Sequence, residues 1–236
     1  MSIILNSLVL VSKIIPKNTR VKLTSNVINR FIDRYADIKV INRQILEERK
    51  GTPTIYIANH LSNVDGVILN RFLRNNNVAF MAGIKLSKNP VTNLVMETIN
   101  TIQITPNSAD KRAIKEAIKH LKNKGSIFIF PEGTRSRTGS LIQAKKGFIL
   151  LAKMSNCKII PIGLEGTEKL VPIHHTNMGK EKFNHAKVKI TFGEAFSLPE
   201  KTEENKKVWT EYVTEYSMKK IAELLDPKYQ GVYRIK

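Results

Sequence analysis

The feature that most constrains this 236-residue chain is a series of short apolar runs that alternate with helical patterns from about residue 38 onward. Seven of these runs have the length and apolar character of strands. They are Ile38–Ile41, Thr54–Ala58, Val78–Met81, Ile102–Thr105, Ile127–Phe130, Lys158–Ile162 and Val188–Phe192. This alternation predicts an α/β fold, in which a largely parallel mixed sheet is covered by helices.

Helical patterns fill several intervals between the strands and the stretch after the last one. The expected helices are Asp65–Arg74, Ser108–Lys124, Gly147–Ser155 and Glu200–Leu225. In the second of them, Asn107 can serve as the N-cap and Gly125 stands where a C-cap is expected. Its inner stripe is expected at Ile114, Ile118 and Leu121.

The first 35 residues differ from the rest because they are basic and their apolar residues follow helical spacing. An apolar run, Ile3–Ile15, precedes Pro16 and is too short and too interrupted to span a bilayer as a helix. The stripe that follows consists of Leu23, Val27, Phe31 and Tyr35, widened by Ile28 and Ile32. Two basic amphipathic helices suit an anionic membrane surface, and the same stripe fits packing on the domain core equally well. The expected organisation is a membrane-associating two-helix motif at 1–36 and an α/β domain at 37–236.

The net charge of the chain is strongly positive. Lys and Arg total 39 against 20 Asp and Glu, which gives +19. Such a charge attracts nucleic acid, anionic lipids, phosphorylated substrates or acidic proteins without choosing among them. No nucleic-acid motif is present and the basic residues lack interleaved aromatics, so nucleic acid is not an expected partner. The single cysteine, Cys157, excludes an intramolecular disulfide and fits a small buried apolar position.

A first polar motif, Asn59-His-Leu-Ser-Asn-Val-Asp65, follows an apolar strand and opens a helix. Ligand sites of parallel sheets lie at the carboxyl ends of strands, which is where His60 is expected. A histidine can act as a general base near neutral pH. Asp65, in the first turn of the helix, can hold the other ring nitrogen and stabilise the imidazolium. A capping aspartate beside a structural histidine would give the same spacing.

A second motif, Phe130-Pro-Glu-Gly-Thr-Arg135, also follows an apolar strand. Gly133 permits close approach of the backbone to an anion, and Arg135 supplies a forked cation suited to phosphate. Lys145 adds positive potential nearby. An ordinary basic loop between a strand and a helix is the alternative for this segment taken alone.

The two motifs together predict one site, because both lie at carboxyl ends of strands. The chain has neither a Gly-x-Ser-x-Gly nucleophile elbow nor a phosphate loop that ends in Gly-Lys-Ser/Thr. The other histidines lack spaced metal-ligand partners and are interpreted as surface residues: His120, His174, His175 and His185. Neither a metal nor a cofactor is expected. A base without a protein nucleophile indicates that the hydroxyl of a substrate attacks.

These segments resemble the motifs of the glycerolipid acyltransferases, the family that contains the 1-acylglycerol-3-phosphate acyltransferases. The segments that carry the resemblance are Asn59–Asp65, Phe130–Arg135, Ala144–Phe148 and Ile159–Gly163. They correspond to the first motif, the third motif, the segment leading into the next helix, and the fourth motif. The resemblance covers about residues 38–195, and it implies an α/β domain, preceded in some members by a two-helix membrane motif.

The resemblance also implies roles for the motif residues. His60 deprotonates the acceptor hydroxyl, which attacks an acyl thioester, and Asp65 orients His60. The residues implied to hold the glycerol-phosphate end of the acceptor are Glu132, Gly133, Thr134 and Arg135, with Lys145 beside them. Pro161 and its neighbours shape the acyl side, and no acyl-enzyme forms.

One segment departs from the family pattern. The second family motif usually ends in an arginine that helps to bind the acceptor phosphate, and Pro106 stands in that place here. Asn100 replaces the usual glycine. The nearest bases are Lys111 and Arg112, expected on the next helix. The departure bears on the identity of the acceptor more than on acyl transfer.

Three hypotheses follow. The first is transfer of a fatty acyl group from acyl-CoA or acyl-carrier protein to the lysophospholipid 1-acylglycerol 3-phosphate, giving phosphatidic acid in phospholipid synthesis. The second keeps the chemistry and changes the acceptor to another lysolipid. The third is a non-catalytic basic module that binds an anionic membrane or nucleic acid. The expected location is the cytoplasmic face of the cell membrane, as a peripheral or monotopic protein.

Overall fold

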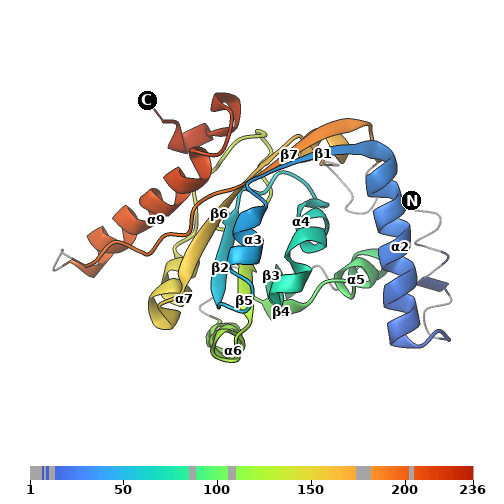
Figure 1. The fold of residues 1–236 in the computed structure, drawn as a ribbon, viewed down its shortest axis with the longest axis horizontal. Coiled ribbons are helices and arrows are strands. Elements are labelled where there is room, and N and C mark those ends of the chain that lie inside the picture. The colour runs from blue at the N-terminus through green and yellow to red at the C-terminus, as the bar shows by residue number, and fades with distance from the viewer. Residues whose placement is uncertain are drawn as a thin grey trace.

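A seven-stranded sheet forms the middle of the computed structural model, which describes residues 7, 9–10, 14–84, 89–105, 110–173, 182–201 and 205–235 (Figure 1). Its strands are β1 (Ala36–Ile41), β2 (Thr54–Ala58), β3 (Val78–Gly83), β4 (Thr101–Ile104), β5 (Ser126–Ile129), β6 (Lys158–Glu165) and β7 (Ala186–Phe192). Their spatial order is β1-β7-β6-β2-β5-β3-β4. Every neighbouring pair is parallel except β6 and β7. The expected largely parallel mixed sheet is therefore confirmed.

Helices cover both faces of this sheet. They are α2 (Lys17–Tyr35), α3 (Gln44–Glu48), α4 (Asp65–Leu73), α5 (Pro90–Met96), α6 (Lys111–Lys122), α7 (Gly147–Ser155), α8 (Thr167–Leu170) and α9 (Lys206–Ala222). Short 3₁₀ turns are η1 (Arg74–Asn76), η3 (Pro227–Tyr229) and η4 (Gly231–Tyr233). Helices α6, α7 and α9 bury one apolar cluster against the sheet, and α2, α3, α4 and α8 bury another (Figure 1).

The central strand β2 is buried along its whole length, as a parallel strand covered on both faces should be. Ile55 and Ile57 belong to one apolar cluster and Tyr56 and Ala58 to the other, which reflects the two-residue period of a strand. Strands β5 and β6 flank β2 on either side. Chain segments that leave the carboxyl ends of these three strands therefore emerge side by side.

Helix α6 begins later than its sequence pattern predicts and buries two positions that the pattern did not indicate. Its N-cap is Asp110, whose side chain accepts a hydrogen bond from the Ala113 N–H, and the expected cap Asn107 lies outside the described residues. The fully buried positions are Ala113, Ala117 and Leu121. Leu121 of the expected stripe is thus confirmed, Ile118 packs partly buried against the same cluster, and Ile114 is half-buried. Two alanines at this interface let the helix backbone approach the sheet closely.

The end of α6 also differs from expectation. The left-handed residue is Lys124, with φ of 59°, and Gly125 follows it. Gly125 is needed for another reason, since a Cβ there would overlap the ring of His120. His120 is half-buried, and its Nε2 lies 2.9 Å from the carbonyl oxygen of Asn77. His185 is exposed as expected, and His174 and His175 lie outside the described residues.

The last helix, α9, is shorter than the predicted range Glu200–Leu225. Asn205 caps it by accepting a hydrogen bond from the Lys207 N–H. After Ala222 the chain turns back through η3 and η4 instead of continuing as a helix. Cys157 is half-buried and packs against the cluster beneath α6, α7 and α9. The short helices α3, α5 and α8 were not expected from the sequence.

Helix α2 confirms the second amphipathic segment at the N-terminus. Ile28 and Ile32 are buried against the domain, while Leu23 on the flank of the stripe is exposed. Arg20 pairs with Glu97, the C-cap of α5, with 2.8 Å between Nε and Oε2. Most of the earlier run, Ile3–Ile15, lies outside the described residues. Across the part of the chain that the structure describes, no helix combines the length and the apolar character needed to cross a membrane.

Candidate active site

The two polar motifs meet where β2 and β5 end. Ile57 is paired with Ile129 in the parallel register, so the residues that follow each strand start from the same level of the sheet. On the other side, the Asn59 side chain exchanges two hydrogen bonds with the backbone of Leu164, each 2.8 Å long. This amide continues the β2–β6 pairing one step beyond the strand and holds the start of the motif to the sheet.

His60 and Asp65 form the pair expected from their spacing. Nδ1 of His60 lies 2.8 Å from Oδ2 of Asp65. Because a carboxylate oxygen is an acceptor, Nδ1 carries the proton and Nε2 keeps a lone pair. The His60 side chain is 19% exposed and the Asp65 side chain is fully buried. The exposed nitrogen can therefore accept a proton while the buried carboxylate stabilises the resulting imidazolium.

Asp65 is positioned by the turn that it closes. Its Oδ2 also accepts the backbone N–H groups of Leu61 at 2.7 Å and Ser62 at 2.8 Å. Asp65 is the first residue of α4, where the positive end of the helix dipole favours a carboxylate. Ser62 Oγ donates to the Val171 carbonyl at 2.7 Å and ties the turn to the segment after α8. Five residues of spacing thus let one oxygen hold both the ring and the loop.

Glu132 connects the two motifs from inside the protein. Its Oε1 accepts the His60 backbone N–H at 2.7 Å, and its Oε2 accepts the Ile142 N–H at 3.0 Å. Only 1% of the residue is exposed. Burial raises the pKa of the Glu132 carboxyl from 4.5 to about 7, against the opposing effect of the two backbone donors. Both oxygens of Glu132 thus accept hydrogen bonds within the protein, which indicates a positioning role in place of the expected contact with the acceptor.

Two further residues, for which the sequence predicted no role in the site, hold His60 in place. The Phe130 ring stacks on the His60 ring, with 3.9 Å between centroids and an interplanar angle of 11°. The Ser136 N–H donates to the His60 carbonyl at 2.7 Å. Both residues belong to or adjoin the second motif, and their position directly beside it was the available signal. His60 is thus fixed at its ring, its N–H and its carbonyl.

The tip of the second motif faces outward. Gly133 and Thr134 are exposed and Arg135 is half-buried. Gly133 has φ of 67°, a conformation that favours glycine. A Cβ at this position would lie 3.0 Å from Cδ of Lys145, so the Lys145 side chain lies across the glycine. The structure therefore brings Lys145 to the exposed tip, as the sequence predicted.

The C-terminal segment supports this loop, a feature with no signal in the sequence. Leu141 donates to the Tyr229 carbonyl at 2.8 Å and accepts the Val232 N–H at 3.2 Å. The Ala144 N–H donates to the Tyr233 hydroxyl at 3.0 Å. These bonds fix the loop segment from Leu141 to Ala144, which includes Ile142, whose N–H donates to Glu132. Tyr229, Val232 and Tyr233 thus help to position His60 through an indirect chain of contacts.

The structure describes only part of the segment that departs from the second family motif. Pro106 lies outside the described residues, and β4 ends at Ile104. Arg112, which is on α6 as expected, donates from Nη2 to the Gln103 carbonyl at 2.8 Å. A cation is therefore present at the carboxyl end of β4, although it comes from the following helix. Within the described ranges, no cluster of three metal-ligating side chains is found.

Comparison with known proteins identifies related chains. A family model described as Acyltransferase matches residues 37–165. The chloroplast 1-acyl-sn-glycerol-3-phosphate acyltransferase of Arabidopsis thaliana is 29% identical over 59% of this chain and 38% of its own length. The Bacillus subtilis 1-acyl-sn-glycerol-3-phosphate acyltransferase is 25% identical over 73% of this chain and 80% of its own length.

A solved structure shares the fold over nearly the whole chain. The 1-acyl-sn-glycerophosphate acyltransferase PlsC from Thermotoga maritima superposes with a TM-score of 0.62 and 25% identity, covering 93% of this chain and 88% of that one. The matched region spans well under half the length of the plant relatives, between 38% and 41%. The family match includes both polar motifs and ends at the last residue of β6.

Proposed function

The chain belongs to the acyltransferase family, and on that premise we propose that it transfers a fatty acyl group to 1-acylglycerol 3-phosphate. The donor is acyl-CoA or acyl-carrier protein, and the product is phosphatidic acid. The observation that carries the proposal is the hydrogen bond from His60 Nδ1 to the buried Asp65, which leaves Nε2 as a base beside a cationic loop. The names of the relatives support this acceptor.

The reaction follows from the state of His60. Nε2 takes the proton of the acceptor hydroxyl as its oxygen attacks the thioester carbonyl. The new ester bond forms, the carbon–sulfur bond breaks, and the imidazolium returns its proton to the leaving thiolate. Asp65 stabilises the imidazolium during the intervening step. Because the acceptor itself attacks, no covalent acyl-enzyme is needed.

The exposed tip of the second motif would bind the acceptor phosphate. Arg135 offers a planar pair of donors, and Lys145 offers a point charge beside it. Gly133 and Thr134 present backbone groups at the same tip. Glu132 does not take part directly, and its role is to place the tip against His60.

A second acceptor class is proposed because Pro106 replaces the arginine typical of the family. Arg112 supplies a cation near the end of β4, but its guanidinium already donates to Gln103 and pairs with Glu116. A weaker hold on the acceptor phosphate at this position favours a lysolipid with a different head group. The acyl-transfer step is the same for both acceptors.

The proposed location is the cytoplasmic face of the cell membrane. Leu10, Ile14 and Leu23 are exposed apolar residues at and before α2. The exposed basic residues Lys22 and Arg30 of α2 complement an anionic surface. The N-terminal segment 1–36 is therefore proposed as a membrane-associating motif, with part of α2 also packed on the domain.

The test is a thiol-release assay with long-chain acyl-CoA, then acyl-carrier protein, and a panel of lysolipids. Loss of a general base usually costs about 10²–10⁴-fold in rate, so His60→Ala should lose this much. His185→Ala is the matched control, since His185 is an exposed histidine that is not part of the His60–Asp65 pair. Best activity with 1-acylglycerol 3-phosphate supports the first acceptor, and a preference for another lysolipid supports the second. Release that is absent, or equal in wild type and His60→Ala, would refute acyl transfer and favour a non-catalytic basic module.

A further inference from the structure

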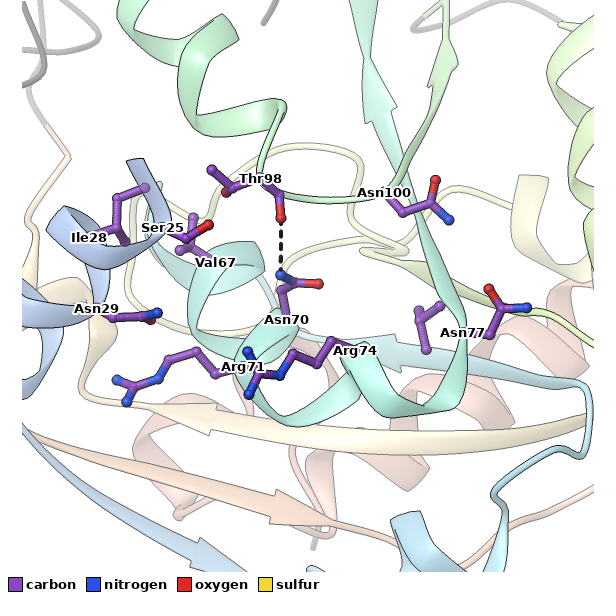
Figure 2. A pocket seen from close by; sticks show the side chains of 11 residues that line it. Ser25, Ile28, Asn29, Val67, Asn70, Arg71, Arg74, Asn77, Thr98 and Asn100 are labelled. Atoms are coloured by element: carbon purple, nitrogen blue, oxygen red, sulfur yellow. Dashed lines mark hydrogen bonds between the residues drawn. The ribbon is translucent and has the colours of Figure 1, made fainter. Parts of the chain in front are cut away.

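A polar cavity of about 270 Å³ lies between α2, α4 and the starts of β3 and β4 (Figure 2). Asn77 and Asn100 stand directly before β3 and β4, so the cavity is at the amino ends of these strands. His60 follows the carboxyl end of β2, which runs parallel to them in the same sheet. The cavity and the candidate active site are therefore at opposite edges of the sheet.

The charged groups of the cavity are all positive. Arg71 lies in the last turn of α4 and Arg74 begins η1, and in Figure 2 both side chains extend in the same direction, toward α2. No Asp, Glu or Lys is among the eleven lining residues. The remaining polar lining is mostly amide, from Asn29, Asn77 and Asn100 together with Asn70. Such a wall offers N–H donors to an anion. The carboxylate of Asp33 on α2 is not part of this lining, but it pairs with Nη2 of Arg71.

The donors of Arg71 are incompletely satisfied. Its Nη2 donates to Oδ1 of Asp33 on α2 at 2.7 Å. Its Nη1 is buried and has no hydrogen-bond partner within the described chain. A buried donor without an acceptor costs free energy that a bound acceptor atom would recover. The unpaired Nη1 of Arg71 therefore favours a bound acceptor atom in the cavity, which positive charge alone would not indicate.

Arg74 adds a second guanidinium group to the cavity, and no contact within the described structure explains its presence there. Its side chain makes no hydrogen bond or ion pair to any residue in the described ranges. Cations at the end of α4 do complement the helix dipole, which accounts for the sign of the charge. The dipole does not account for the buried Nη1 or for the cavity that separates α4 from the strand ends.

We propose that this cavity is a second anion site, built to bind a phosphate group through Arg71 and Arg74. Guanidinium groups match the tetrahedral oxygens of phosphate with paired donors, and the asparagine amides can satisfy the oxygens that remain. The site holds a free phosphate compound or the phosphate head group of a lipid, because both present the same chemistry. Its ligand is independent of acyl transfer at His60.

The experiment follows the Nε–Hε NMR signals of the arginines in the full chain during titration with inorganic phosphate at constant ionic strength. Residue-resolved signals separate this site from phosphate binding at Arg135. Arg74→Gln identifies one signal and removes a side chain with no structural partner, so the variant is expected to fold. Arg234→Gln is the matched control, because Arg234 is also exposed and is unbonded among the described residues. It lies in the C-terminal segment, and Figure 1 shows the C-terminus on the opposite side of the molecule from α2.

The expected result is a saturable shift of the Arg71 and Arg74 signals in wild type and in Arg234→Gln. Affinity for phosphate at Arg71 should fall about tenfold or more in Arg74→Gln, as expected when one charge-assisted hydrogen bond is lost. Unchanged Arg71 and Arg74 signals, or equal affinity in Arg74→Gln and wild type, would overturn the proposal.

Vesicle binding then separates the two sources of phosphate. Phosphatidylcholine vesicles with and without phosphatidic acid are compared by flotation with wild type and both variants. If the ligand is a lipid head group, Arg74→Gln weakens binding to the vesicles with phosphatidic acid and Arg234→Gln does not. If the ligand is a free phosphate compound, the two variants bind vesicles equally while the loss of phosphate affinity persists. Both results support the site, and they assign its occupant.

Discussion

The loop after β2 and the tip of the loop after β5 lie beside one another, but the first buries its polar groups and the second exposes them. In the first loop Asn59, Ser62 and Asp65 are fully buried, and all of them form hydrogen bonds inside the protein. At the tip of the second loop, Gly133 and Thr134 are exposed. Glu132, one residue before that tip, belongs with the buried group.

The difference separates positioning from binding. A buried polar group that already has its partners contributes rigidity, since a ligand could reach it only by breaking those bonds. An exposed donor contributes affinity, since a ligand replaces water. Changes in the buried group should therefore alter the rate of the chemical step and stability together. Changes at the tip should alter acceptor binding and leave stability nearly constant.

The largest effect is expected from Asp65→Ala. Loss of the carboxylate leaves His60 without an orienting partner, and kcat should fall about 10³–10⁴-fold. Two buried N–H groups also lose their acceptor, at a cost in unfolding free energy of about 1–3 kcal/mol each. Steady-state kinetics and denaturant unfolding measure both quantities.

Asp65→Asn is the matched control for this change. An amide oxygen placed like Oδ2 can still accept all three hydrogen bonds, but the negative charge is gone. Stability should then recover more than activity does. Full activity in Asp65→Asn would show that orientation alone matters and that the charge does not.

The next largest effect is expected at Arg135, which is half-buried and directly follows the exposed tip. Arg135→Gln should raise the acceptor KM about 10–100-fold, because charge-assisted hydrogen bonds to a phosphate are lost. Its effect on kcat at saturation should be smaller. Arg234→Gln removes the same charge elsewhere and should leave the acceptor KM unchanged. A loss of stability in Arg135→Gln as large as that in Asp65→Ala would break the comparison between the loops.

Glu132→Gln should lower kcat about tenfold, because a glutamine amide cannot accept both the His60 and the Ile142 N–H. The acceptor KM should stay near that of wild type. An increase in KM with unchanged kcat would instead place Glu132 in direct contact with the acceptor.

The same variant should change how stability depends on pH. The Glu132 pKa is about 7 in the folded protein and 4.5 as its ordinary value, so the folded state binds this proton more tightly. The unfolding free energy of wild type should therefore fall as pH rises from 4.5 to 7, by about 3 kcal/mol from this group. Glu132→Gln should lack that slope. Parallel pH profiles for the two proteins would contradict the assignment.

The smallest effect is expected from Gly133→Ala. An alanine in the left-handed conformation costs roughly 1–2 kcal/mol, and the flexible Lys145 side chain can move away from the added methyl. Acceptor KM should rise a few-fold with little change in kcat. Gly51→Ala, at another exposed glycine with positive φ and open space around it, controls for the backbone cost.

Local patterns predicted much of the fold and part of the site. Strand β2 was predicted with its observed bounds, and α7 likewise, because an apolar run and its flanking polar residues mark an element directly. The pairing of His60 with Asp65 was predictable since five residues span one turn. The two buried alanines of α6 were missed because alanine is a weaker hydrophobic signal than isoleucine.

By itself, then, the sequence determined the alternation of strands and helices, the two motifs after β2 and β5, and the basic character of the chain. The tertiary structure decided that Glu132 faces inward to an N–H 72 positions away, and that the C-terminal turns support the loop at Leu141. It also decided that Arg71 and Arg74 share a cavity with Asn29 of α2 and with Asn100, which directly precedes β4. The physical reason is that residue spacing along the chain predicts contacts only within one helix, strand or turn. The order of strands in the sheet, which brings remote segments together, determines which buried polar groups find partners.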